Sequence, residues 1–130
     1  MADIDLAILA DIESSGNPLA LNEHSGAMGL YQIMPKGKKG ALDEWNQYHP
    51  KEQYRDDDLY DKDINTKIAS WYIGERIPKM LKYFKHPDTL ENRLTAYNAG
   101  ISRVGCEIPK ETQDYINKYK TRQMNRWNIE

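Results

Sequence analysis

The chain has 130 residues, a formal net charge of −2 and 39% hydrophobic residues. That length suits one domain around one core and is too short for two. The small net charge gives no global field that would attract nucleic acid. Cys106 is the only cysteine, so an intrachain disulfide and a thiolate metal cluster are excluded. No histidine is near Cys106 in the sequence, and we do not expect a nucleophilic thiol.

The N-terminal residues are acidic where a secretory signal would be basic, and the apolar run over residues 6–10 is too short for a signal core. No segment has the length of a membrane span. We therefore predict no span. An action outside the cell would require delivery by a phage particle or a lysis system, or excision of this chain from a longer exported protein.

The first third of the chain is predicted to hold a helix and a turn-rich loop. Isoleucines at every fourth position predict a helix over residues 3–14, which Asp3 would cap and Gly16 would end. Glycine, asparagine and proline over residues 16–30 predict that the chain reverses there. A short helix is expected over residues 29–33.

The middle of the chain shows a weaker pattern. Residues 36–63 contain many turn formers and an acidic run, with a possible short helix over residues 41–48. A long apolar stripe then predicts a helix over residues 63–84, which Pro78 would divide or kink.

Two further helices are predicted at the C-terminal end. One covers residues 89–99, with Thr89 as its cap and Gly100 as its stop, and the last begins near Pro109. No stretch alternates with a period of two, and there are no internal repeats. The sequence therefore predicts an all-α fold, with residues 1–130 forming a single domain.

Glu13 is the first candidate for chemistry. Cleavage of a glycosidic bond needs a carboxylic acid that stays protonated near neutral pH, and burial against apolar neighbours produces such a group. Glu13 follows Ile12 at the end of a predicted helix, where the negative end of the helix dipole also disfavours ionisation. From position alone, an exposed glutamate at a frayed helix end is the ordinary interpretation.

Two further stretches carry polar groups in unusual settings. Residues 25–32 (SGAMGLYQ) place Gln32, a donor and acceptor for sugar hydroxyls, after glycines that allow close backbone approach. Residues 96–100 (AYNAG) end a helix with Tyr97 and Asn98. Taken alone, the first is equally a structural turn, and Tyr97 is more often a core aromatic.

Together with residues 13–18 (ESSGNP), these stretches resemble, in order, the motifs of the family 1 lytic transglycosylases, the SLT domain of the goose-lysozyme-like superfamily. Tyr31 stands where the family usually has methionine. Residues 108–116 (IPKETQDYI) resemble a fourth family segment, whose glutamate lines the cleft. The match runs from about residue 7 to residue 119 and is poorest over residues 36–60.

The resemblance implies a lysozyme-like domain of several helices around a substrate cleft. It also implies cleavage of the β-1,4 bond between N-acetylmuramic acid and N-acetylglucosamine in peptidoglycan. In the family one glutamate acts as acid and then as base, and the 6-hydroxyl of the sugar closes a 1,6-anhydro ring. The resemblance makes Glu13 that acid. It gives substrate-binding or site-shaping roles to Ser14, Met28, Tyr31, Gln32, Tyr97, Asn98 and Glu111. We expect the Tyr97 hydroxyl to lie against the Glu13 carboxyl.

Two alternatives stay open. A goose-type lysozyme would use the same acid with water as the nucleophile, and ordinary glycosidases need a second carboxylate, for which Asp11, Glu23 and Glu111 are candidates. The other alternative is a non-catalytic wall-binding or structural module that kept the fold. Glu111 also lies in a first helical turn, where its charge is favourable in any case.

Cofactors and partners follow from the remaining residues. The run from Asp61 to Asn65 begins like a calcium loop but lacks its glycine and bidentate glutamate, so we interpret it as the cap of the next helix. His24, His49 and His86 lack metal-ligand spacing, and we predict no metal, no cofactor and a monomer that binds glycan strands.

Lysines cluster twice along the chain. A solvated face is the ordinary interpretation of such clusters, and contact with an anionic polymer such as a cell wall is the alternative. The clusters are Lys36, Lys38 and Lys39, and Lys79, Lys82 and Lys85.

Overall fold

The structure is a computed structural model that describes residues 4–36 and 40–128. Within these ranges extended pairing is limited to isolated bridges, so the predicted all-α fold class is confirmed. The helices are α1 (Leu6–Ser14), α2 (Ala41–Tyr48), α3 (Lys62–Trp71), α4 (Ile77–Tyr83), α5 (Leu90–Ala99) and α6 (Lys110–Asn128), with 3-10 segments η1 (Asp56–Tyr60) and η3 (Ile101–Arg103) and a π-helical segment η2 (Tyr72–Arg76).

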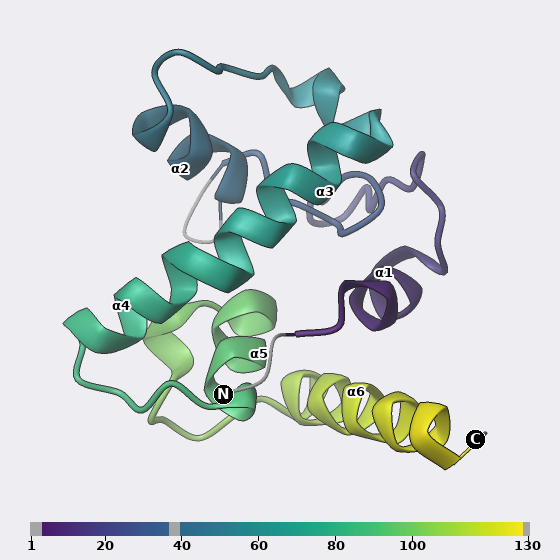
Figure 1. Cartoon of the computed structure of the whole chain (residues 1–130), viewed down its shortest axis with the longest axis vertical. Helices are drawn as coiled ribbons and strands as arrows, with labels where there is room; N and C mark the ends of the chain where they lie inside the picture. The colour runs from purple at the N-terminus through teal and green to yellow at the C-terminus, as the bar shows by residue number, and fades with distance from the viewer. Residues whose placement is uncertain (1–3, 37–39, 129–130) are drawn as a thin grey trace.

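The long predicted helix crosses the molecule and organises the rest of the fold. Figure 1 shows α3, η2 and α4 as one continuous rod, with α2 on one side and α1, α5 and α6 on the other. Its first turn is capped by Asp61, whose carboxylate accepts from the backbone N–H groups of Asp63 and Ile64 at 2.9 and 3.1 Å. The run from Asp61 to Asn65 therefore caps this helix through Asp61, as predicted.

Pro78 does not divide the rod but changes its pitch. Proline has no N–H, and its ring clashes with the carbonyl one turn earlier in a regular α-helix. Here the preceding turn is π-helical, and the N–H of Ile77 donates to the carbonyl of Tyr72. The wider turn leaves room for the proline ring at the start of α4.

The termini of two other helices show how the sequence sets their lengths. α1 begins at Leu6, where the Asp5 carboxylate accepts from the N–H groups of Ala7 and Ile8, so the predicted helix starts later than expected; Asp3 lies outside the described residues. α5 is capped by Thr89 and ends at Gly100, both as predicted.

The prediction of a short helix over residues 29–33 is wrong. The chain instead makes a tight turn, and the backbone groups of Met28 and Ile33 exchange hydrogen bonds of 3.0 Å in each direction. Gly29 and Gln32 have φ values of 81° and 51°, which are left-handed and incompatible with a right-handed helix. The predicted chain reversal over residues 16–30 is confirmed by a second bridge, between Leu21 and Met28.

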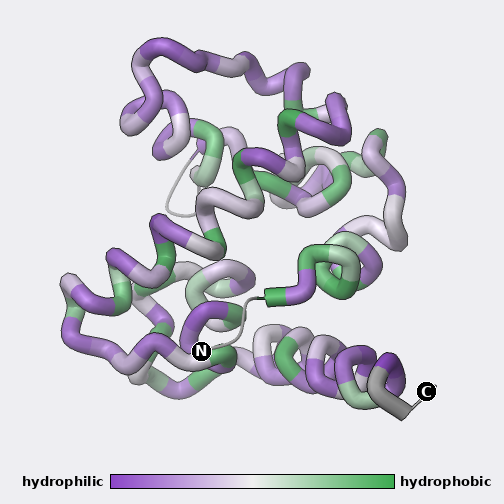
Figure 2. The backbone as a smooth tube through the Cα atoms, in the orientation of Figure 1, coloured by the Kyte–Doolittle hydropathy of each residue, from purple (hydrophilic) through white to green (hydrophobic). Residues whose placement is uncertain are grey.

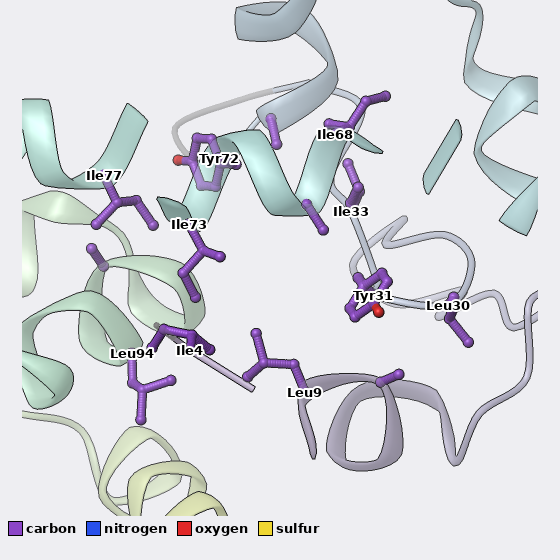
Figure 3. Packing of buried hydrophobic residues seen from close by; sticks show 14 of the residues in the cluster. Ile4, Leu9, Leu30, Tyr31, Ile33, Ile68, Tyr72, Ile73, Ile77 and Leu94 are labelled. Carbon is purple, nitrogen blue, oxygen red and sulfur yellow. The ribbon is translucent and has the colours of Figure 1, made fainter. Parts of the chain in front are cut away.

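The core lies between the rod, α1, α5 and the turn-rich loop, which in the structure comprises residues 15–34 between α1 and α2. Figure 3 shows side chains from all of these segments converging, and Figure 2 shows that α6 is mostly hydrophilic along its length. α6 nevertheless contributes Tyr115, Ile116 and Tyr119 to the hydrophobic core. The labelled core residues of Figure 3 are Ile4, Leu9, Leu30, Tyr31, Ile33, Ile68, Tyr72, Ile73, Ile77 and Leu94.

Candidate active site

A cleft of about 320 Å³ lies between the turn-rich loop and the ends of α1, α5 and α6. Each motif singled out in the sequence contributes to it, although the motifs are far apart along the chain. The lining residues are Glu13, Asn22, His24, Ser25, Ala27, Gln32, Ile33, Met34, Ala41, Tyr72, Tyr97, Asn98 and Glu111.

Glu13 enters the cleft from the last turn of α1 and is half-buried. Two backbone bonds close this end of the helix. The N–H of Ser15 donates to the backbone carbonyl of Asp11 at 3.0 Å, and the N–H of Gly16 donates to that of Ala10 at 3.2 Å. Ser15 takes a left-handed conformation, with φ of 54°. The chain therefore turns away directly after Glu13, and the carboxylate is left at the cleft wall.

The carboxylate of Glu13 accepts a hydrogen bond of 2.8 Å from the hydroxyl of Tyr115 on α6. α6 contacts α1 at two further points. The Tyr119 hydroxyl accepts from the N–H of Asp5, the cap of α1, at 2.9 Å, and Arg122 forms an ion pair with Asp11 in the second half of α1. Both ends of the Glu13–Tyr115 bond thus belong to one packed helix pair. A glutamate whose rotamer is fixed in this way is oriented before any substrate arrives.

The Tyr97 hydroxyl lies near enough to the Glu13 carboxylate for that charge to raise its pKa, but it donates its proton elsewhere. That hydroxyl donates to the carbonyl of Tyr31 at 2.7 Å and so fixes the turn-rich loop to α5. The Tyr97 ring still lines the cleft and packs beside Tyr72, with 6.2 Å between ring centroids. Its hydroxyl therefore holds the loop against α5.

The phenols around Glu13 remain neutral donors. Burial raises the pKa of the Tyr97 and Tyr115 hydroxyls well above their usual value, and the nearby Glu13 carboxylate raises them further. Burial likewise raises the pKa of Tyr72, with a further contribution from Glu44. The wall next to Glu13 therefore carries no tyrosinate charge at neutral pH.

A buried amide holds the turn-rich loop in place. Asn65 is fully buried at 0% exposure, and its oxygen accepts from the N–H of Tyr31 at 3.0 Å. Its nitrogen donates to the carbonyls of Met28 and Leu59 at 3.0 and 2.8 Å. Gly29 lies directly against this amide, because an added Cβ would stand 2.3 Å from the Asn65 nitrogen. Only glycine fits here.

Gln32 projects from this loop into the cleft. Its side-chain nitrogen donates to the carbonyls of Ala20 and Gly29 at 3.3 and 3.1 Å, so its donors bind the loop itself. Its carbonyl oxygen is then the group suited to a ligand donor such as a sugar hydroxyl or an N-acetyl N–H. The backbone of Gln32 is left-handed, a conformation that is energetically unfavourable for a residue other than glycine.

Asn98 and Glu111 line the opposite side. The buried hydroxyl of Thr112 donates to the Asn98 side-chain oxygen at 2.8 Å and so joins the end of α5 to the start of α6. Glu111 lies in the first turn of α6 and is exposed to the cleft. Of the three candidates for a second carboxylate it is the one in the lining, since Asp11 pairs with Arg122 and Glu23 is exposed outside it.

Three predicted site residues do not line the cleft. The Ser14 hydroxyl donates to the carbonyl of Leu30 at 2.7 Å, so it connects α1 to the loop. Met28 and Tyr31 are buried in the core, at 8% and 5% exposure. The structure places all three where they support the cleft from behind.

Several lining residues were not predicted from sequence. Tyr72 belongs to the apolar stripe of the predicted long helix, and Asn22 to the predicted chain reversal. His24 is considered only as a metal ligand, and Ser25 lies in the second motif, where Gln32 is the residue singled out. Tyr115 was available in the fourth motif, IPKETQDYI, but only its glutamate was singled out. The four-residue spacing from Glu111 to Tyr115 puts both on one side of α6, and that spacing was the signal.

Among the described residues, no group of three or more histidine, cysteine, aspartate or glutamate side chains is arranged to hold a metal. The same part of the chain contains no helix long and apolar enough to cross a bilayer.

Comparison with known proteins identifies the family. The model of the transglycosylase SLT domain matches residues 4–120. The chain belongs to the SLT domain family. The match includes every motif that forms the cleft, and it is the domain of the family 1 lytic transglycosylases, which act on peptidoglycan. No curated protein and no solved structure matches the chain significantly.

Proposed function

We propose that this SLT domain is a lytic transglycosylase that cleaves the bond between N-acetylmuramic acid and N-acetylglucosamine in peptidoglycan. The observation that carries the proposal is the setting of Glu13: a half-buried carboxyl group in a cleft, oriented by Tyr115 and facing polar groups from the loop and α5. Family membership supports the substrate class.

In the proposed reaction Glu13 gives its proton to the leaving glycosidic oxygen as the bond to the anomeric carbon breaks. The substrate's own N-acetyl group or ring oxygen stabilises the positive centre. The ionised Glu13 then takes the proton of the 6-hydroxyl, whose oxygen closes the 1,6-anhydro ring. Both steps use one carboxylate, and the intramolecular attack has the advantage of a high effective concentration.

The other cleft residues are assigned roles on the same basis. The Gln32 oxygen and the Asn98 amide bind hydroxyl and N-acetyl groups of the glycan, and Glu111 faces an adjacent part of the strand. The Tyr72 and Tyr97 rings exclude water from the reacting carbon, which favours ring closure over hydrolysis. Ser14, Met28 and Tyr31 act indirectly, by fixing the loop.

One observation favours a second candidate, a lysozyme that releases reducing ends. Glu111 is a second carboxylate in the cleft, and a suitably placed carboxylate can activate water for a direct attack. The two reactions differ only in product. The presence of an oriented Glu13 in the cleft argues against the other alternative, a non-catalytic wall-binding or structural module.

Mass spectrometry of fragments released from purified peptidoglycan tests the proposal. We expect muropeptides that end in 1,6-anhydromuramic acid, lighter by one water than reducing-end fragments. Glu13→Gln should lower release by at least about a hundredfold, because it removes the acid without changing the side-chain size. Glu107→Gln, an exposed glutamate outside the cleft, is the matched control and should release fragments at the wild-type rate.

Reducing-end products that depend on Glu13 would show that the protein is a lysozyme and not a transglycosylase. Equal release by the Glu13→Gln protein and the wild type would overturn both assignments. A wild-type protein that binds the glycan without Glu13-dependent release would establish the non-catalytic module.

A further inference from the structure

The end of α4 exposes two adjacent aromatic side chains. Tyr83 is 79% exposed and Phe84 is 51% exposed, and their ring centroids lie 4.9 Å apart at an interplanar angle of 89°. Two large apolar groups exposed side by side form an apolar patch, and interaction sites are among the surfaces that expose such patches. Figure 1 shows that α4 ends at the edge of the molecule, across from the C-terminal end of α6.

Lysines flank this aromatic pair in the sequence. Lys79, Lys82 and Lys85 are all exposed, and none of them takes part in an ion pair within the described part of the chain. Lys79 and Lys82 border a hollow of about 440 Å³. We call the five residues Lys79, Lys82, Tyr83, Phe84 and Lys85 the α4 tip.

Acidic groups near the α4 tip do not cancel its charge. Asp88 borders the same hollow, but its carboxylate is bound by the Arg93 guanidinium at 2.6 and 2.8 Å. Glu75 borders a neighbouring hollow, together with Lys79 and Arg76. His86 is the remaining titratable group of the lining. The surface is therefore positive although the whole chain has a net charge of −2.

The backbone holds Lys85 in a conformation that favours glycine. The N–H of His86 donates to the carbonyl of Leu81 at 2.8 Å, and the N–H of Lys85 donates to the carbonyl of Lys82 at 3.1 Å. These two bonds form a Schellman motif, which ends α4. Lys85 stands at its left-handed position, with φ of 62°. A glycine would end the helix without this strain, so the fold itself does not require a lysine at residue 85.

We propose that the α4 tip is an interfacial site for the surface of a bilayer that contains anionic phospholipids. Tyr83 and Phe84 would enter the headgroup region, and the three lysines would lie along the surface with their ammonium groups at lipid phosphates. The perpendicular rings form a wedge rather than the flat platform that a sugar ring stacks on, which favours lipid over glycan. This inference goes beyond the proposed enzymatic function and does not rest on it.

Co-sedimentation of the full chain with vesicles tests the proposal. We expect binding to mixed phosphatidylglycerol–phosphatidylcholine vesicles, weaker binding as salt is raised, and none to phosphatidylcholine alone. The Tyr83→Ser/Phe84→Ser double variant should bind at least tenfold more weakly. Met124→Ser, an apolar residue on α6 with 63% exposure, is its matched control and should bind as the wild type does.

Lys85→Gly separates binding from folding. Removal of the left-handed side chain should raise the melting temperature by roughly 3 °C. Loss of one surface cation should weaken vesicle binding roughly fivefold. Lys118→Gln, which removes an exposed cation from α6, should leave binding nearly unchanged. A lysine that mattered only to the fold would not give these opposite effects.

The proposal would be overturned by a wild-type protein that ignores anionic vesicles, or by variants of the α4 tip that bind vesicles as well as the wild type. It would also be overturned if the same variants lost binding to lipid-free cell-wall polymer and not to vesicles, because the α4 tip would then be a polymer site. Vesicle binding is independent of fragment release, so either hypothesis can fail without the other.

Discussion

The two walls of the cleft are built on different physical principles. The loop wall, residues 20–34, has little regular structure, and its shape depends on hydrogen bonds from Asn65 and from the Tyr97 hydroxyl. The helical wall, formed by α5 and α6, is held by buried apolar residues such as Leu94 and Ile116. Polar contacts that fix a loop concentrate stability in single atoms, whereas apolar packing distributes it.

This difference predicts where the site is fragile. A change of one polar group in the loop wall should displace the cleft residues next to it. A similar change in the helical wall should alter either the Glu13 carboxylate or nothing at all, depending on whether the polar group faces the cleft. The predictions below test this contrast, beginning with the largest expected effect.

Asn65→Ala should have the largest effect. It removes the partners of a buried N–H and two buried carbonyls, each of which costs about 1–3 kcal/mol when left unsatisfied. We expect the free energy of unfolding to fall by about 4 kcal/mol. Activity should fall further than the loss of stability explains, because the turn that carries Gln32 loses its hydrogen bonds to the residue-65 side chain. Denaturant unfolding and fragment release at a temperature where the variant is folded measure the two effects.

Asn65→Asp is the companion variant. It keeps the acceptor for the Tyr31 N–H but loses the donors to Met28 and Leu59, so it should not recover the wild-type stability. If both Asn65 variants retained wild-type fragment release, the loop wall would not depend on this amide, and the contrast between the walls would be lost.

Tyr115→Phe should have an intermediate effect, confined to catalysis. It removes the hydrogen bond that orients Glu13 but keeps the ring that packs in the core. We expect kcat for peptidoglycan to fall about tenfold with little change in KM, because the groups proposed to bind substrate are untouched. The free energy of unfolding should drop by only about 1 kcal/mol. An unchanged kcat would show that α1 alone orients the acid.

The sequence predicted the helical wall better than the loop wall, for a physical reason. Apolar periodicity and caps such as Thr89 and Gly100 are local signals, so the spans of α2 and α5 and the start of α6 were predictable. The turn at Gly29 depends on Asn65, which lies 36 residues further along the chain, and no local pattern reports such a contact. A helix was therefore predicted where a bridged turn is formed.

The candidate site divides in the same way. Glu13 and the residues of the AYNAG motif could be identified by resemblance, but not the direction of each hydroxyl. Whether Tyr97 or Tyr115 donates to Glu13 depends on how α5 and α6 pack against α1. Sequence spacing does not fix the rotation of either helix about its axis, so it does not choose between the two hydroxyls.

Thr95→Val should have the smallest effect and the opposite sign. Thr95 is 1% exposed on α5, and its hydroxyl has no hydrogen-bond partner in the described structure. Valine has nearly the same shape, so the change removes a buried unpaired hydroxyl without leaving a cavity. We expect the free energy of unfolding to rise by about 1 kcal/mol, measured by denaturant unfolding, with fragment release unchanged. A loss of stability comparable to that of Asn65→Ala would show that the helical wall also depends on single polar atoms, and would remove the distinction between the two walls.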